Sequence, residues 1–166
     1  MLQEMKNQTL TEEKTMNNME LWNKVCKTDP KYIKQVGFGA RKFTAIDPQY
    51  QVRSITEQFG AVGVGWGWNS TTEYIHFNNG DVAVVSGVSI WTHADEKNIF
   101  GPFNGCRKFF DAGKGRLAED APKMAITDGL TKALSHLGFN ADVFLGEMDG
   151  NKYAQDEKGK GNDAGW

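Results

Sequence analysis

Basic side chains cluster beside aromatic ones in the second half of the sequence. Arg107 and Lys108 stand directly before Phe109 and Phe110. The residues that follow add four more cations, which are Lys114, Arg116, Lys123 and Lys132. Cations neutralise the phosphates of a nucleic acid, and aromatic faces stack on its bases. The pattern favours a nucleic-acid-binding groove, although the two phenylalanines fit a hydrophobic core equally well.

A predicted helix over residues 121–137 carries some of these cations. Lys123, Thr127 and Thr131 recur every four residues and therefore share one helical face, and Lys132 lies about 100° around the helix from Thr131. Such a polar line can donate several hydrogen bonds to one phosphate backbone. The predicted buried stripe consists of Ile126, Leu130, Ala133, Leu134 and Leu137.

The two ends and one interior position of this helix are also marked in the sequence. Asp120 and Pro122 are typical of a helix start, and Gly138 is typical of a stop. Gly129 lies inside the helix, where glycine costs about 1 kcal/mol relative to alanine. We therefore expect another segment to approach the helix closely at Gly129.

Catalytic and cofactor patterns are weak. The three histidines fall in different predicted elements, and none has metal-ligand spacing with another histidine or with Cys26 or Cys106. The glycine-rich stretch over residues 60–68 has no GxxxxGK[ST] sequence and does not open a helix. We therefore predict a protein that is not an enzyme and needs no cofactor and no metal.

The charge of the 166-residue chain is unevenly distributed. The net charge is −2, which argues against a uniformly basic surface. Residues 20–60 and residues 97–132 each carry seven bases and four acids, whereas residues 61–96 contain four acids and neither Lys nor Arg. Two basic blocks therefore flank an acidic middle, and a local cationic stripe is compatible with the mildly acidic total.

The remaining pattern predicts one α+β domain over residues 18–149, an antiparallel β-meander packed on the long C-terminal helix, with additional N-terminal helices. We expect helices over residues 19–36 (broken at Asp29-Pro30) and 48–59, a short strand over 41–47, and a hairpin of 64–77 with 82–92 around an Asn-Asn-Gly-Asp turn. A shorter strand over 99–110 follows, and its glycines and Pro102 indicate that it is either bulged or at a sheet edge. Residues 1–17 are expected to be disordered, and residues 150–166 to form a flexible acidic tail whose Trp166 is a candidate contact for a partner.

No stretch approaches the roughly 20 apolar residues of a membrane span, and the first residues are polar rather than signal-like. Two cysteines are too few for a disulfide scaffold. These features predict a cytoplasmic protein that does not bind a membrane.

Three segments resemble one known family. They are RKFTAIDPQYQVRSITEQFG, HFNNGDVAVVSGVSI and, most specifically, APKMAITDGLTKALSHLG. Together they are similar to the Rad-fifty-two-type single-strand DNA annealing proteins, in particular the short phage-encoded branch. The resemblance spans roughly residues 32–145. It implies a ring-shaped or helical homo-oligomer that binds single-stranded DNA in a basic groove and anneals complementary strands during recombination without ATP.

The resemblance also implies individual groove residues. Thr127 matches a groove position, and Thr131 and Lys132 match a pair that is basic in the eukaryotic members. Lys34 or Arg41 matches a further base before the first strand, and Lys114 and Arg116 match a lysine-bearing loop. Candidate partners are single-stranded DNA, a phage exonuclease and a single-strand DNA-binding protein. The complete predicted DNA-binding set is Lys34, Arg41, Arg107, Lys108, Lys114, Arg116, Lys123, Thr127, Thr131 and Lys132.

Two other functions stay open at this point. The order of helix, hairpin, strand and helix coarsely resembles a double-stranded-RNA-binding module. A non-nucleic-acid oligomeric scaffold is the other alternative.

Overall fold

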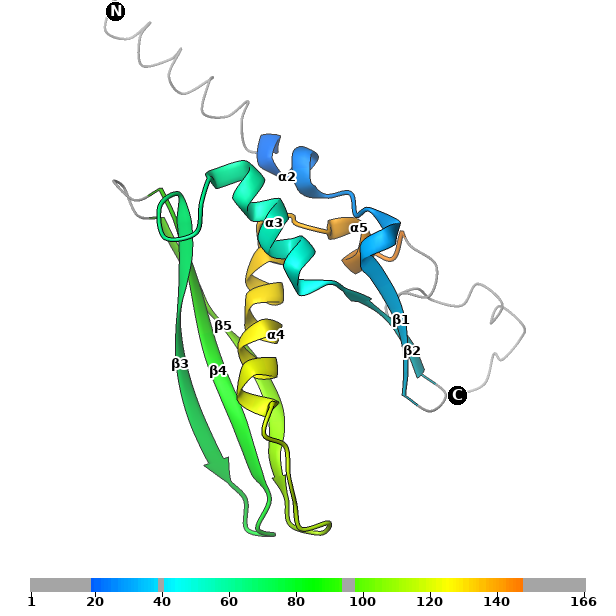
Figure 1. Cartoon of the computed structure of the whole chain (residues 1–166), viewed down its shortest axis with the longest axis vertical. Helices are drawn as coiled ribbons and strands as arrows, with labels where there is room; N and C mark the ends of the chain where they lie inside the picture. The colour runs from blue at the N-terminus through cyan, green and yellow to red at the C-terminus, as the bar shows by residue number, and fades with distance from the viewer. Residues whose placement is uncertain (1–18, 39–40, 94–97, 148–166) are drawn as a thin grey trace, which may run out of the picture.

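A four-stranded antiparallel sheet and a two-stranded hairpin lie on opposite sides of one long helix (Figure 1). The computed structural model describes residues 19–38, 41–93 and 98–147. The fold is mixed α+β, as predicted. The expectations for residues 1–17 and 150–166 lie outside the described residues.

The larger sheet is a meander with strand order β3-β4-β5-β6. The strands are β3 (Trp66–His76), β4 (Val82–Thr92), β5 (Asn98–Asp111) and β6 (Arg116–Leu117). The predicted hairpin is confirmed, and Gly80 in its turn has a φ of 85°, a conformation that glycine adopts at little cost. On β4, the side chains from Val84 to Thr92 alternate between buried and half-buried, so one face of the sheet is covered.

Strand β5 is longer than predicted. It has 14 residues, and its pairing with β4 shifts register at two places, next to Val82 and next to Val88. The predicted bulge is therefore confirmed, whereas the expectation of a strand shorter than its neighbours is wrong. Because a bulge absorbs one extra residue, β5 can follow β4 along its whole length.

Helix α4 (Ala121–His136) packs on the covered face of β4 and β5. Its fully buried face consists of small residues at four-residue spacing, which are Ala121, Ala125, Gly129 and Ala133, together with Leu134. The predicted stripe is wrong in part, because Ile126, Leu130 and Leu137 are only half-buried. Small side chains let the helix approach the sheet closely, and this close approach decides which face is buried.

The predicted close approach at Gly129 is confirmed. A Cβ atom on Gly129 would lie 2.7 Å from Val88 Cγ2 and 2.8 Å from the Phe103 carbonyl oxygen. Gly105 on β5 is even tighter, since a Cβ there would lie 1.9 Å from the Ala125 carbonyl oxygen. The helix and the strand therefore meet backbone to backbone.

The second sheet is the hairpin of β1 (Ile33–Phe38) and β2 (Arg41–Ile46). Strand β2 confirms the short strand predicted there. The helix expected to continue to residue 36 is wrong, because Ile33 pairs with Ile46 and Val36 with Phe43 in an antiparallel ladder. Long-range pairing thus outweighs a weak local helical spacing, and β-branched Ile33 and Val36 suit a strand.

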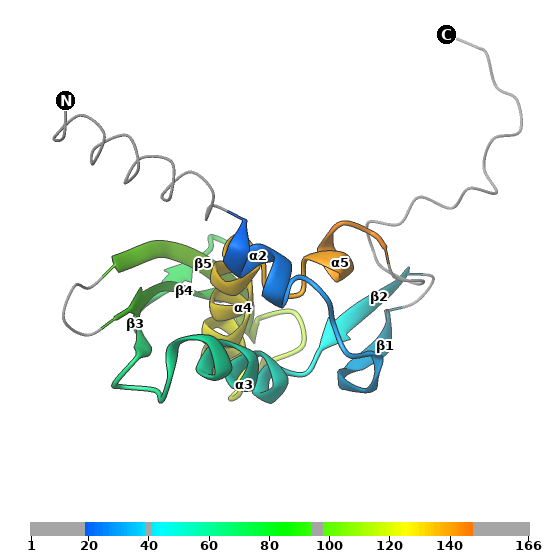
Figure 2. The ribbon, with the colours of Figure 1, turned by 90° about the horizontal axis from the view of Figure 1, so that it is seen from above.

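The other helices are short or amphipathic. Helix α2 (Glu20–Val25) and helix α5 (Ala141–Phe144) lie near the C-terminal end of α4, whereas α3 (Pro48–Phe59) crosses α4 (Figures 1 and 2). The 3-10 turn η1 (Pro30–Tyr32) leads into β1, and its Tyr32 ring stacks on Tyr50 of α3. The Asp47 side chain accepts hydrogen bonds from two backbone N–H groups at the start of α3. A core of Ile55, Trp66, Ile90, Leu134 and Phe139 joins these elements.

A chain of buried hydrogen bonds links the N-terminal segment to α4. The Thr28 N–H and hydroxyl donate to Asp142 at 2.7 and 2.5 Å, and Asn140 Nδ2 donates to Thr28 Oγ1 at 3.0 Å. Gln51 Nε2 donates to Asn140 Oδ1 at 3.4 Å, and Thr131 Oγ1 donates to Gln51 Oε1 at 2.8 Å. This buried polar chain satisfies side chains that would otherwise destabilise the core.

In the part of the chain that the structure describes, no helix is both long enough and apolar enough to cross a lipid bilayer.

Candidate functional site

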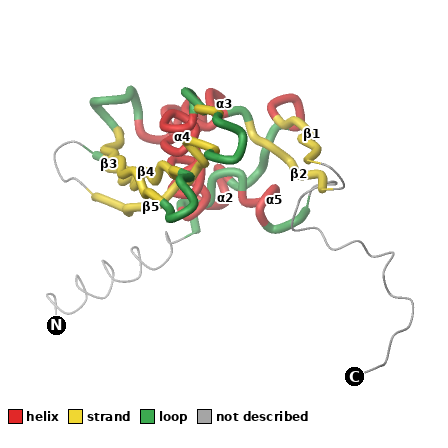
Figure 3. Tube along the Cα trace, turned by 90° about the horizontal axis from the view of Figure 1, so that it is seen from below, coloured by secondary structure: helices red, strands yellow, loops and turns green. Residues whose placement is uncertain are grey.

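A groove of about 790 Å³ runs between α4 and the β1–β2 hairpin. One wall is the face of α4 that points away from the sheet, extended by Arg107 of β5. The other wall is β2 with the start of α3 and part of α5. Seen from above and from below, α4 lies between the sheet and the hairpin, so the groove and the sheet occupy opposite sides of this helix (Figures 2 and 3).

Five of the predicted DNA-binding residues line this groove. Lys123, Thr127 and Thr131 follow one another along α4 at four-residue spacing, as the helical pattern predicts. Lys132 and Arg107 lie beside them. The structure thus brings together residues from a helix and from a strand that are 16 or more positions apart in the sequence.

A single carboxylate, that of Asp128, faces two of the three groove cations. Lys132 Nζ lies 3.0 Å and Arg107 Nη1 3.6 Å from the same oxygen, Asp128 Oδ2. Lys132 also donates to the Asn104 carbonyl oxygen, and Arg107 to that of Cys106, each at 2.8 Å. The third cation, Lys123, lies 3.7 Å from the carboxylate of Asp120, which does not line the groove. Among the described residues, the groove lining therefore contains three cations and one anion. Asp128 was not among the site residues predicted from the sequence. It appeared there only within the segment APKMAITDGLTKALSHLG, which resembles the annealing proteins.

The two groove threonines donate their hydroxyl protons within the protein. Thr127 Oγ1 donates to the Lys123 carbonyl oxygen at 3.0 Å, and Thr131 Oγ1 donates to Gln51. The expected donation from a threonine line to a phosphate backbone therefore differs from the observed hydrogen bonding. In this conformation the threonines offer oxygen lone pairs to the groove, and phosphate binding falls to the cations.

The hairpin wall is more apolar than the α4 wall. It includes Phe43, Ala45 and Ile46 of β2 and Phe144 of α5, and Met124 faces it from α4. The sequence did not indicate this wall, because its β2 residues lie more than 70 positions before α4 and only the long-range packing of the hairpin places them opposite that helix. A groove with cations on one side and an apolar surface on the other suits a linear ligand that is charged along one edge.

Three other predicted residues lie outside the groove. Lys34 is exposed on β1, while Lys114 and Arg116 are exposed at the β5–β6 turn, and none of the three lines the groove. Arg41 begins β2, but its side chain lies outside the described part of the structure. The basic residues of the segment 97–132 are therefore divided between the groove and the β5–β6 end of the sheet.

Lys108 belongs to a different cluster. Its Nζ lies 2.9 Å from Asp81 Oδ2 and 3.3 Å from Asp111 Oδ2. Asp81 also accepts the Ala112 N–H at 2.8 Å, which connects the β3–β4 turn to the end of β5. Nearby, Phe109 packs against the hydrophobic core around Val84. Of the two roles that the sequence left open for Phe109, base stacking or core packing, the structure shows core packing.

The Asp81 cluster predicts a pH-dependent stability. The hydrogen bond from Lys108, followed by the one from the Ala112 N–H, lowers the pKa of Asp81. Because the pKa of Asp81 is lower in the folded state, the ionised carboxylate stabilises the fold at any pH above the pKa of Asp81 in the unfolded chain, which is about 4. This stabilisation is lost as the pH falls through the lower pKa of the folded state.

We therefore expect Asp81→Asn to reduce the free energy of unfolding at pH 7 but to flatten its acid dependence. Urea unfolding followed by circular dichroism at neutral pH and below about pH 4 measures both effects. Equal acid dependence in the variant and the original protein would contradict the assignment.

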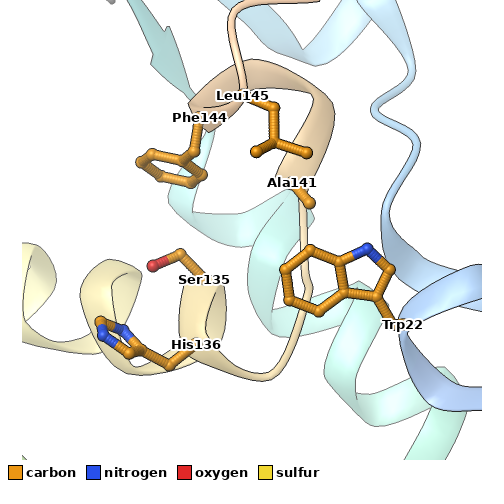
Figure 4. A pocket seen from close by; sticks show the side chains of 6 residues that line it. All are labelled: Trp22, Ser135, His136, Ala141, Phe144 and Leu145. Carbon is orange, nitrogen blue, oxygen red and sulfur yellow. The ribbon is translucent and has the colours of Figure 1, made fainter. Parts of the chain in front are cut away.

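A second cavity, of about 420 Å³, lies at the other end of α4 (Figure 4). It is lined by Trp22 of α2, Ser135 and His136 of α4, Phe144 of α5 and the following Leu145. His136 Nδ1 is 2.8 Å from the Lys132 carbonyl oxygen, and its ring lies against Phe103 with centroids 4.6 Å apart. The histidine is held by these contacts at the helix end.

Within ranges 19–38, 41–93 and 98–147, no three His, Cys, Asp or Glu side chains are grouped so that they could hold a metal ion. Both cysteines are free thiols.

No protein-family model matches this sequence, and no curated protein sequence matches it either. The function must therefore be inferred from the groove and from the residues that line it.

Proposed function

We propose that this protein binds single-stranded DNA in the groove between α4 and the β1–β2 hairpin and promotes the annealing of complementary strands. The observation that carries the proposal is the convergence of Arg107, Lys123 and Lys132 on one groove wall. Among the described residues that line the groove, these three cations face one carboxylate, that of Asp128. With Asp120 paired to Lys123 outside the lining, the wall still has a net positive charge in a chain whose net charge is −2. Phosphate neutralisation by such cations supplies sequence-independent affinity.

The two unlike walls favour a single strand over a duplex. A single strand has phosphates along one edge and base faces along the other, and it can lay its phosphates on α4 while sugars or bases contact Phe43 and Phe144. A duplex has phosphates on both outer edges, and one of these edges would meet the apolar hairpin wall. Contacts of this kind do not distinguish base sequences, which suits a protein that must accept any pair of complementary strands.

We further propose that the protein acts as a homo-oligomer formed through the edges of its larger sheet. Among the described residues, β3 has a paired strand on one side only, and β6 pairs with only the last two residues of β5. Strand β3 exposes Trp68, Tyr74 and Ile75 by 39–47%. Long, apolar edge strands readily pair with another chain. Pairing β3 of one copy with β5 of the next is a head-to-tail contact, which generates rings or helical filaments.

Nothing in the proposal requires a nucleotide or a metal. The free energy for annealing comes from base pairing, and a row of grooves repeated around an oligomer would hold each strand extended. The cations of neighbouring subunits would then form a continuous track, so the charge of each groove matters more than the net charge of each chain.

Binding and annealing tests separate this proposal from its alternatives. We expect fluorescence anisotropy to show binding of a labelled 30-nucleotide single strand, with an affinity that falls steeply as salt rises. Fluorescence energy transfer between complementary oligonucleotides should show faster annealing without ATP, and analytical ultracentrifugation should show oligomers.

Preferential binding of duplex RNA in competition with the single strand would contradict the proposal in favour of an RNA-binding module. Oligomers that bind no oligonucleotide at any salt concentration would instead indicate a scaffold protein.

A further inference from the structure

We infer that Asp128 occupies, within the protein's own groove, the position that a phosphate oxygen takes when a polyanion binds, and that it thereby sets the affinity of the groove. This inference rests on the proposed function, because it assigns a regulating residue to the same site. Lys132 and Arg107, from a helix and a strand, converge on one oxygen atom of this carboxylate. Two cations directed at a single oxygen form an oxyanion site, and in this structure the oxyanion is a side chain.

The local geometry supports displacement of the carboxylate rather than permanent burial. The Asp128 side chain is 25% exposed, Arg107 41% and Lys132 50%, so the ion pairs face solvent at the groove surface. Exposed ion pairs are screened by water and contribute little to stability. A phosphate, which accepts hydrogen bonds through several oxygens, can therefore replace the carboxylate at modest cost.

Each cation also donates a hydrogen bond that does not involve Asp128. The carbonyl oxygens of Asn104 and Cys106 hold Lys132 and Arg107, respectively, on the β5 side of the groove. Loss of the carboxylate would leave the cations in place and raise the local charge by one unit. The carboxylate thus weakens polyanion binding without being needed to position the cations, which would favour the release and exchange of strands during annealing.

The test replaces Asp128 by its neutral isostere. One more uncompensated cation steepens the slope of log K against log salt by about 0.7 for a single strand, which corresponds to about fivefold tighter binding at ~0.1 M salt. We therefore expect Asp128→Asn to lower the Kd of a 30-nucleotide single strand by about fivefold and to steepen the salt slope. An unchanged Kd and slope in Asp128→Asn would overturn the inference.

Glu57→Gln provides the matched control. Glu57 forms the same kind of pair four residues apart on a helix, with Arg53 Nε at 2.8 Å, and neither residue lines the groove. The control makes the same change in net charge, so its Kd and salt slope should equal those of the original protein. An equal gain in affinity in both variants would show an effect of overall charge and overturn the inference.

A probe without bases separates this inference from the proposed function. Tripolyphosphate should raise the Tm of Asp128→Asn more than that of the original protein, whether or not the groove binds DNA. If tripolyphosphate stabilises Asp128→Asn no more than the original protein, the inference fails even where DNA binds. If the Tm responds as expected but no single strand binds, the oxyanion site stands and the proposed DNA function fails.

Discussion

Simultaneous replacement of Arg107, Lys123 and Lys132 by alanine is expected to weaken single-stranded DNA binding by roughly 100-fold per groove at ~0.1 M salt. Each cation that neutralises one phosphate of a single strand contributes about 0.7 to the salt slope, or about fivefold in affinity at that salt concentration. The three cations lie together on one groove wall, so their losses should combine. Anisotropy titrations across a salt series measure both the Kd and the slope, which should become shallower by about 2.

Lys24, Lys31 and Arg53 offer a control with the same change in charge. All three are exposed, take part in ion pairs with nearby carboxylates and lie outside the groove. Their combined replacement by alanine should leave the Kd nearly unchanged. If both triple variants lose affinity equally, binding depends on the overall charge rather than on the groove.

The affinity of the double variant Lys114→Ala/Arg116→Ala should fall between those of the two triple variants, because both residues are exposed but distant from the α4 wall.

Gly105→Ala is expected to destabilise the fold by at least about 3 kcal/mol. The added Cβ would lie 1.9 Å from the Ala125 carbonyl oxygen, which belongs to the backbone in the interior of α4 and cannot move as a side-chain end can. Overpacking in a dense core costs about 1–3 kcal/mol and sometimes more, and here strand and helix would have to separate. Urea denaturation followed by circular dichroism measures the loss in the free energy of unfolding.

Gly37→Ala is the matched control for this prediction. Gly37 lies on the exposed strand β1, and a Cβ there would meet no atom within 4 Å. We expect this variant to be neutral or to gain a few tenths of a kcal/mol, because alanine restricts the unfolded chain more than glycine does. A Gly105→Ala variant as stable as Gly37→Ala would show that α4 does not contact β5 as closely as described.

The parts of the fold that follow a local pattern could be predicted from the sequence. The bounds of α4 and of the β3–β4 hairpin agree with expectation within a few residues, because capping residues, turn residues and alternation lie within short windows. The same holds for the polar line of Lys123, Thr127 and Thr131, since helical spacing alone decides which side chains share a face. The buried side of α4 was less predictable, because close contact with Gly105 selects small residues over the larger ones that hydrophobicity favours.

The features that depend on distant pairing could not be predicted in this way. Strand β1 forms because β2 pairs with it, and the apolar wall exists because the resulting hairpin lies opposite α4. The separation of Lys108 from Arg107 follows from the alternation of β5, which directs neighbouring side chains to opposite faces of the sheet. The pairing of Asp128 with both groove cations likewise required the position of β5 beside α4.

The buried polar chain from Thr28 to Thr131 bears on how much of the sequence is needed to make a working groove. The groove lining begins at Phe43, so a truncated chain starting just before β2 would keep every lining residue. Such a chain would nevertheless leave Asp142 buried without the N–H and hydroxyl of Thr28. Leaving a buried polar group without its hydrogen bonds typically costs about 1–3 kcal/mol, a sizeable part of the stability of a domain of this size. The minimal folding unit therefore extends at least to Thr28, well ahead of the surface that it serves.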